Sequence, residues 1–285
     1  MRIRCVFVAM LAVGAGVTAR ADRPWVPMSV DSSGSVVVPV SIGAAGPFLF
    51  LLDTGSTHTA ISEALADRLD MPLVARTTVL TSTGREWRPI VRLREVAIGR
   101  GRAHDVMASV APGAQLAGIA RGIEGIIGQD FLLDLNYTLD YRRKRLWWSA
   151  ASAAETDTVV LPLVKQEGRY LVQASAGVSR SMLLVPDSGA DALVMFDREG
   201  RTVPALDADT SAASVKSLSG MSPARTIVVP ELRLGAFTMR NQRVAVVHRE
   251  RSDALEGDGL LPLHLFASVS FNAREQSLVV RRYAE

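Results

Sequence analysis

The sequence of 285 residues contains a single cysteine, Cys5, which lies in the first apolar stretch. If that stretch is removed, no thiol remains, and disulfides, cysteine-ligated metals and a thiol nucleophile are excluded. The chain has 4 histidines, no two of them three or four residues apart, so we expect no metal site and no cofactor. The Gly-x-Ser-x-Gly motif of serine hydrolases and the glycine-rich loops of nucleotide-binding enzymes are also missing.

A real excess of positive charge is lacking too. The formal net charge is +3, but residues 1–21 contain Arg2, Arg4 and Arg20 and no acid. Without these three arginines, 29 basic residues face 29 acidic ones. We therefore expect no nucleic-acid partner and no attraction to a membrane surface. The share of hydrophobic residues, 48%, is that of an ordinary globular protein.

The N-terminal segment has the pattern of an export signal. Two arginines precede an apolar run from Cys5 to Val17, and Ala19-Arg20-Ala21 has the small-x-small form of a cleavage site. We expect residues 1–21 to be a signal peptide and the mature protein to be periplasmic or secreted. No later run is long enough to span a membrane. The alternative is a buried N-terminal helix.

An internal repeat organises the rest of the chain. Asp53-Thr54-Gly55-Ser56 returns as Asp187-Ser188-Gly189-Ala190, and Glu124 to Gly128 returns as Asp258 to Pro262, both after 134 residues. A constant offset between two separate motifs indicates two copies of one unit. The boundary falls in a stretch rich in Ala, Ser and Thr, so we predict lobes at 22–155 and 156–285.

Each copy is predicted to be rich in β-strands. Short apolar runs separated by turn residues predict three hairpins in the first copy. Their strands are expected at 36–42 with 48–52, 77–80 with 87–93, and 136–140 with 145–148. Helices are expected to be short, one after the N-cap residue Ser62 and another at 129–135.

The repeated aspartates are the candidate catalytic residues. Asp53 and Asp187 each follow an apolar strand and precede a hydroxyl residue and a glycine, which is expected for its conformational freedom in a tight turn. If the copies meet about a two-fold axis, the two carboxyl groups approach each other and share one proton. A water held between them could then be activated by one acid while the other donates a proton.

These motifs resemble those of pepsin- and retropepsin-type aspartic proteases, with the retropepsin-like unit present twice. The resemblance covers about residues 35–148 and 168–282 and implies an all-β, bilobal fold with an active-site cleft between two barrel-like lobes. It implies that Asp53 and Asp187 are catalytic. The residues it places around them are Thr54, Gly55, Ser56, Ser188 and Gly189, and, in the ψ-shaped loops behind them, Ile127, Gly128 and Leu261.

The resemblance also implies hydrogen bonds. The hydroxyls of Thr54 and Ser188 would bond to the opposite lobe, and that of Ser56 would contact Asp53. Ala190 has no hydroxyl to do the same for Asp187, so the two acids should be inequivalent.

The second copy departs from the family pattern. Pro262 replaces the second ψ-loop glycine, so this loop either runs differently or supports Asp187 less well. His264 stands where the first copy has Asp130, and Pro186 directly precedes Asp187.

A flap that covers the site is predicted over Ser82, Thr83 and Gly84, with Trp87 just beyond, and residues 217–221 hold the matching place in the second copy. The alternative for Ser82 to Gly84 is a plain surface turn.

Together these features predict an exported aspartic endopeptidase that binds an extended peptide or protein segment. We expect a monomer without an integral membrane segment, because one chain supplies both acids. One alternative is a peptide-binding pseudoprotease of the same fold, because the departures gather in the second copy. Another is a structural envelope protein in which both acids only cap turns.

Overall fold

The computed structural model describes residues 24–81, 84–150, 157–176, 180–197, 211–217, 220–248 and 257–283. The predicted signal segment 1–21 and the predicted boundary at 155 lie outside these residues. Most of the described chain is β-strand, which confirms the all-β prediction. None of the described helices has the length and apolar character needed to cross a membrane.

The elements follow one another in the same way in both halves. In the first half they are β1 (Trp25–Pro27), β2 (Ser29–Val30), β3 (Val36–Ile42), β4 (Ala45–Leu52), β5 (Ala60–Ser62), α1 (Glu63–Arg68), β6 (Leu73–Thr81), β7 (Gly84–Ile98), β8 (Gly101–Ala111), α2 (Gly113–Ile119), β9 (Gly125–Ile127), α3 (Gln129–Leu132), β10 (Tyr137–Asp140) and β11 (Arg145–Trp147). In the second half they are β12 (Thr158–Gln166), β13 (Arg169–Ala176), β14 (Arg180–Asp187), β15 (Leu193–Asp197), β16 (Ser211–Ser217), β17 (Gly220–Leu234), β18 (Phe237–His248), β19 (Gly259–Pro262), the 3₁₀ turn η2 (Leu263–Leu265), β20 (Ser268–Asn272) and β21 (Ser277–Arg281).

The first half forms an eight-stranded sheet in the order β2-β3-β4-β9-β5-β8-β7-β6. An additional pairing of β3 with β7 curls this sheet into a partial barrel. Strand β3 shows why such segments form strands, because its residues alternate between buried and partly exposed, and Val36, Val38 and Val40 are fully buried.

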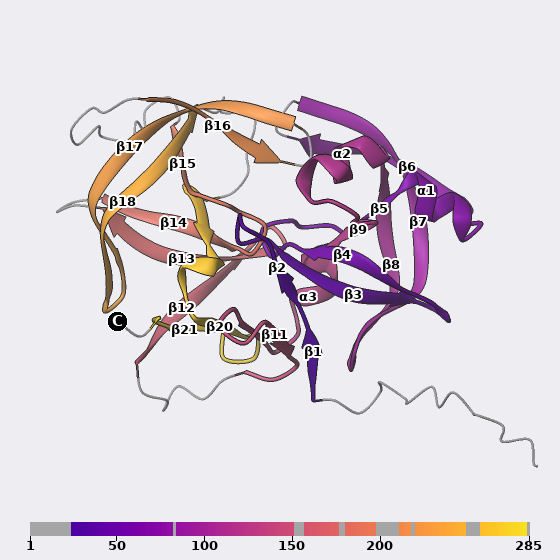
Figure 1. The fold of residues 1–285 in the computed structure, drawn as a ribbon, viewed down its shortest axis with the longest axis horizontal. Helices are drawn as coiled ribbons and strands as arrows, with labels where there is room; N and C mark the ends of the chain where they lie inside the picture. Colours follow the sequence, from indigo (N-terminus) through magenta and orange to yellow (C-terminus); the bar gives the residue numbers. More distant parts are fainter. Residues whose placement is uncertain are drawn as a thin grey trace, which may run out of the picture.

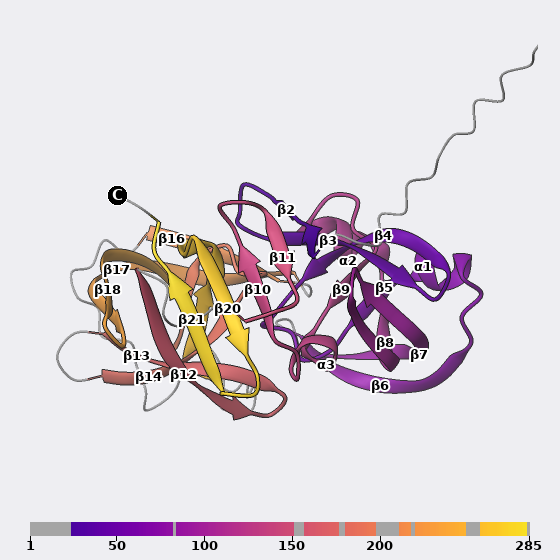
Figure 2. The same ribbon diagram turned by 90° about the horizontal axis from the view of Figure 1, so that it is seen from below.

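The second sheet has 13 strands and joins the two halves. Its order begins β1-β11-β10-β20-β21-β12, so three strands of the first half lie beside three of the second (Figures 1 and 2). At the junction Tyr137 of β10 pairs with Phe271 of β20, and these residues are equivalent in the repeat. A pair of equivalent residues that face each other marks the pseudo-two-fold axis.

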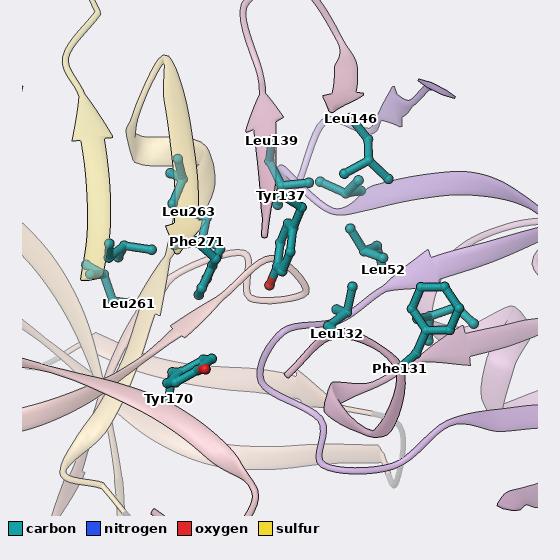
Figure 3. Packing of buried hydrophobic residues seen from close by; sticks show 14 of the residues in the cluster. Leu52, Phe131, Leu132, Tyr137, Leu139, Leu146, Tyr170, Leu261, Leu263 and Phe271 are labelled. Carbon is teal, nitrogen blue, oxygen red and sulfur yellow. The ribbon is translucent and has the colours of Figure 1, made fainter. Parts of the chain in front are cut away.

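The main hydrophobic core continues across this junction. The rings of Tyr137 and Phe271 are stacked with their centroids 4.7 Å apart, and Tyr170 lies against Phe271 at 6.4 Å. Figure 3 shows Leu52 and Leu132 of the first half close to these rings. Such a stacked pair stabilises by about 0.5–1.5 kcal/mol beyond its buried area. The two halves therefore share one core.

The predicted hairpins are present, and some elements differ in length. The hairpin of β6 and β7 is longer than predicted, and α3 is shorter. Helix α1 begins as predicted, with the Leu65 N–H donating to the Ser62 hydroxyl at 3.0 Å. Helix α2 was not predicted, because two of its seven residues are glycine and no side chain caps its start.

Candidate active site

Asp53 is positioned by two buried parallel strands. Strand β4 pairs with β9 so that Leu52 lies opposite Ile127, and Asp53 is the next residue of the chain. The Asp53 N–H donates to the Ile127 carbonyl at 3.0 Å. Both leucines before Asp53 are buried, whereas Asp53 itself keeps partial exposure. The carboxyl group therefore stands at the end of a buried strand, at the edge of the core.

Asp187 occupies the same position in the second half. Strand β14 pairs with β19 in parallel, with Pro186 opposite Leu261 and Asp187 opposite Pro262. This register matches that of the first half, so the loop does not run differently at Pro262. The carboxyl group of Asp187 is buried, with 7% of the residue exposed.

The proline at 262 is matched by a second replacement. In the first half the Gly128 N–H donates to the Thr59 hydroxyl at 3.3 Å. In the second half the position of Thr59 is taken by Leu193, which offers no acceptor. The N–H that proline lacks therefore has no waiting partner, and the substitution leaves no buried polar group unpaired there.

Asp130 and His264 hold equivalent positions in the two halves but make different contacts. Asp130 accepts hydrogen bonds from the backbone N–H and the hydroxyl of Thr59, at 2.8 and 2.7 Å, and burial raises the pKa of its carboxyl group. His264 instead packs against Gly34 of the first half, and burial lowers the pKa of its imidazole. A hydrogen-bonded carboxyl group in the first half is thus replaced by a packed imidazole in the second.

Hydroxyl groups join the two halves at the level of the acids. The Thr54 hydroxyl donates to the Pro186 carbonyl at 2.7 Å and accepts from the Ser188 N–H at 3.0 Å. The Ser188 hydroxyl donates to the Leu52 carbonyl at 2.5 Å and accepts from the Thr54 N–H at 3.1 Å. Both side chains are buried. Both hydroxyls thus bond to the opposite half, as the family resemblance implies.

Each acid receives backbone N–H groups from its own loop. Asp53 Oδ1 accepts from the N–H groups of Gly55 and Ser56, both at 2.9 Å. Asp187 Oδ1 accepts from those of Gly189 and Ala190, at 2.7 and 3.2 Å. The prediction for the Ser56 hydroxyl is wrong, because it donates to the His58 carbonyl at 2.9 Å. The backbone of residue 56, and not its side chain, contacts the acid.

The glycines of the two loops were expected from the sequence for their conformational freedom, and that expectation is wrong. They are needed because a side chain would not fit. Neither Gly55 nor Gly189 has a positive φ. A Cβ on Gly55 would lie 2.6 Å from Asp187 Cγ, and one on Gly189 would lie 3.1 Å from Asp53 Cγ. Each glycine therefore faces the acid of the opposite half, and the two carboxyl groups are in contact range.

The electrostatics of the pair are unequal. Burial raises the pKa of Asp187 well above its usual value, and the neighbouring charge of Asp53 raises it further. Burial also raises the pKa of Asp53, but its backbone N–H donors, a hydrogen bond with Asp187 and the charge of Arg169 oppose this. The two carboxyl groups therefore have unequal surroundings.

Three further residues near the site were not singled out from the sequence. The side chain of Gln129 donates to the Thr54 carbonyl at 2.6 Å. The Tyr141 phenol and the Arg169 guanidinium are buried and interact electrostatically with Asp187 and Asp53, respectively. Gln129 directly follows the ψ-loop glycine, which is a usable signal. No local pattern indicates the other two, because long-range pairing brings them to the site.

Part of the predicted flap can be located. Ser82 and Thr83 lie outside the described residues, and Gly84 pairs with Thr81 at the end of the β6–β7 hairpin. Trp87 is 73% exposed, and Met221, in the equivalent place on β17, is 57% exposed. Below Trp87 the buried Arg88 donates to Gln115 of α2 at 2.5 Å, which ties the hairpin to the body of the lobe.

In the part of the chain that the structure describes, no three His, Cys, Asp or Glu side chains gather in a way that could hold a metal ion.

Comparison with known proteins gives a family match and two similar solved structures. The family described as aspartyl protease matches residues 38–131 and 174–264. Conglutin gamma, a basic 7S globulin from lupine seeds, has a similar structure with a TM-score of 0.47 and 11% identity, over 91% of this chain and 95% of its own. A retropepsin-like aspartic protease from Rickettsia conorii has a TM-score of 0.34 and 18% identity, over 43% of this chain and 87% of its own.

A search of curated protein sequences found no match. The family match falls on both copies of the repeat and spans more than half of the sequence. This chain belongs to the aspartyl protease family, whose pattern it contains twice in tandem.

Proposed function

We propose that the protein is an active aspartic endopeptidase that hydrolyses peptide bonds by general acid–base catalysis. The observation that carries this proposal is the pair Asp53 and Asp187, held at contact range by reciprocal hydrogen bonds and unequal in pKa. Two carboxyl groups that share one proton provide a base and an acid at the same pH.

The reaction follows from this division of roles. Asp53, the ionised member, takes a proton from the attacking water, and the water oxygen bonds to the peptide carbonyl carbon. Asp187 donates its proton to the carbonyl oxygen, which gives a tetrahedral diol. The C–N bond then breaks as a proton passes from Asp53 to the amine, and Asp187 regains its proton from the diol hydroxyl as the new carboxylic acid forms.

The substrate is proposed to be an extended peptide lying under the two hairpins β6–β7 and β16–β17. Exposed Trp87 and Met221 occupy equivalent places on these hairpins and offer apolar contact to side chains of the peptide. We therefore propose hydrophobic side chains next to the scissile bond and a monomeric enzyme.

The peptide-binding pseudoprotease is the less favoured function. This alternative was based on the departures from the family pattern around Asp187. The strand register and both backbone N–H donors of Asp187 nevertheless match those of Asp53. Pro262 has no N–H to donate, and Leu193 has no hydroxyl that would accept one.

The test is turnover of casein and of a defined peptide mixture between about pH 3 and 7. Asp53→Asn and Asp187→Asn should each reduce kcat/KM by at least ~10³-fold, because either change removes the base or the acid. Asp70→Asn is the matched control, since Asp70 is exposed and its positive φ suits asparagine. Retention of peptides without cleavage by the wild type would favour the pseudoprotease.

We also propose that the enzyme is exported, on the sequence of residues 1–21 alone. Expression of the full chain in a bacterial host should yield a protein that begins near Asp22 in the periplasm or the medium. An intact Met1 terminus in the cytosolic fraction would contradict export and leave the catalytic proposal untouched.

A further inference from the structure

A hairpin of the second half reaches across to the acid of the first. At the end of β12, Lys165 forms an ion pair with Asp134 at 3.0 Å, and at the start of β13 the Tyr170 hydroxyl donates to the Leu133 carbonyl at 2.8 Å. In the turn between these strands, a Cβ on Gly168 would lie 3.9 Å from Thr57 Cγ2. The turn therefore lies beside the loop that follows Asp53.

Arg169 occupies the buried position of this turn. Only 8% of the residue is exposed, and it stands between Gly168 and Tyr170, which both contact the first half. Strand β13 pairs with β14 so that Val172 faces Leu184. Strand β13 begins at Arg169 and the antiparallel strand β14 ends at Asp187, so the arginine stands at the end of this strand pair that leads to the acids.

No equivalent cation exists on the other side of the two-fold axis. The repeat places Ser35 at the position of Arg169 and Asp31 at that of Lys165. Ser35 is buried, with 4% exposure, and its N–H donates to Asp31 at 3.0 Å. The hairpin of the second half thus carries two cations, Lys165 and Arg169, where the repeat places Asp31 and Ser35 in the first half.

Resting on the proposed function, we propose that Arg169 is the positioning residue that breaks the symmetry of the catalytic pair. Its fixed positive charge holds the single negative charge on Asp53 and leaves the proton on Asp187. This assignment makes Asp53 the base and Asp187 the acid in the first step. Burial raises the pKa of Asp53, and the charge of Arg169 opposes this rise, which is the direction that the proposal requires.

Other titratable groups face the pair from the elements around it. Burial raises the pKa of Tyr141 well above its usual value, with a further contribution from Asp187, so its phenol is neutral at the working pH. His264 borders the Asp187 loop, with Asp191 and Asp31 nearby, and burial lowers the pKa of its imidazole. The first-half neighbours are Asp130, which is bonded to Thr59, and His58 beside it. Arg169 differs from all of these groups because a guanidinium stays charged over the whole range.

The experiment is a carboxyl ¹³C NMR titration of the full chain without substrate, with the two acids assigned from Asp53→Asn and Asp187→Asn. In the wild type, Asp53 should ionise first. Arg169→Gln should raise the lower apparent pKa of the pair by about one pH unit, a tenfold change in proton affinity. Arg169→Lys should largely restore it, and Lys165→Gln, which removes an exposed cation of the same hairpin, should leave it unchanged.

Three results would overturn the proposal. These are first ionisation of Asp187 in the wild type, an unchanged lower pKa in Arg169→Gln, or an equal shift in Lys165→Gln. First ionisation of Asp187 in the wild type would overturn the proposal even if Arg169→Gln fails to fold. Because the titration needs no turnover, an inactive protein would refute the proposed function without deciding the role of Arg169. In an active protein, the acidic limb of kcat/KM should move with the titration.

Discussion

Replacement of Thr54 by valine should weaken the junction of the two halves at the catalytic level. The Thr54 hydroxyl is buried, donates to the Pro186 carbonyl at 2.7 Å and accepts from the Ser188 N–H at 3.0 Å. Valine has nearly the same shape, so it leaves no cavity, but it deprives both groups of this partner. A buried polar group left unpaired costs about 1–3 kcal/mol. Two such losses predict a decrease of about 2–6 kcal/mol in the free energy of unfolding, a large fraction of the usual 5–15 kcal/mol.

The assay is urea unfolding at a fixed pH, with Thr54→Ser as the matched control. Serine keeps the hydroxyl and loses only a methyl group, so it should cost about 1 kcal/mol. Peptide turnover should fall in the valine variant, because the acids are no longer held at one separation. If the valine and serine variants unfold within about 1 kcal/mol of each other, the hydroxyl does not join the halves and the reasoning is refuted.

Three further predictions concern the acids and the flap. Asp187→Asn should stabilise the protein increasingly above pH 4, by about 1.4 kcal/mol per pH unit until the folded-state pKa is reached. The raised pKa makes the wild type lose stability as pH rises, whereas the amide of the variant does not ionise. A constant difference between the unfolding free energies of variant and wild type from pH 4 to 7 would contradict this prediction. Gly55→Ala should abolish turnover and cost about 1–3 kcal/mol, more than Gly189→Ala, because its Cβ meets Asp187 more closely; equal effects on unfolding would argue against the crowding. Trp87→Ala should raise KM several-fold with little change in stability, since the ring is exposed, and an unchanged KM for apolar peptides would remove Trp87 from the substrate site.

The sequence predicted the symmetry of the molecule well, because a repeat with constant spacing forces equivalent elements into equivalent places. Asp53 and Asp187, together with the hydroxyls of Thr54 and Ser188, follow from that symmetry and from the family motif. The hairpins also follow from apolar alternation and turn residues, which are local properties of the chain.

What the sequence did not predict depends on contacts across the axis. The role of Gly55 as a space for Asp187 becomes visible only when the second half is in place, and the same is true of Arg169 beside Asp53. Helix α2 has poor intrinsic propensity and relies on the burial of Leu116. In the first half Gly128 donates a hydrogen bond to Thr59. Because Pro262 and Leu193 replace both of these residues in the second half, the sequence alone could have indicated that Pro262 breaks no hydrogen bond there.

The central claim is that the side chains of residues 53 and 187 act on one oxygen atom. A crystal structure with a statine-type inhibitor, whose hydroxyl imitates the tetrahedral diol, tests it most directly. The account predicts that this hydroxyl lies within hydrogen-bonding distance of both carboxyl groups. An inhibitor bound elsewhere, or a hydroxyl that contacts one acid while the other stays beyond reach, would contradict it.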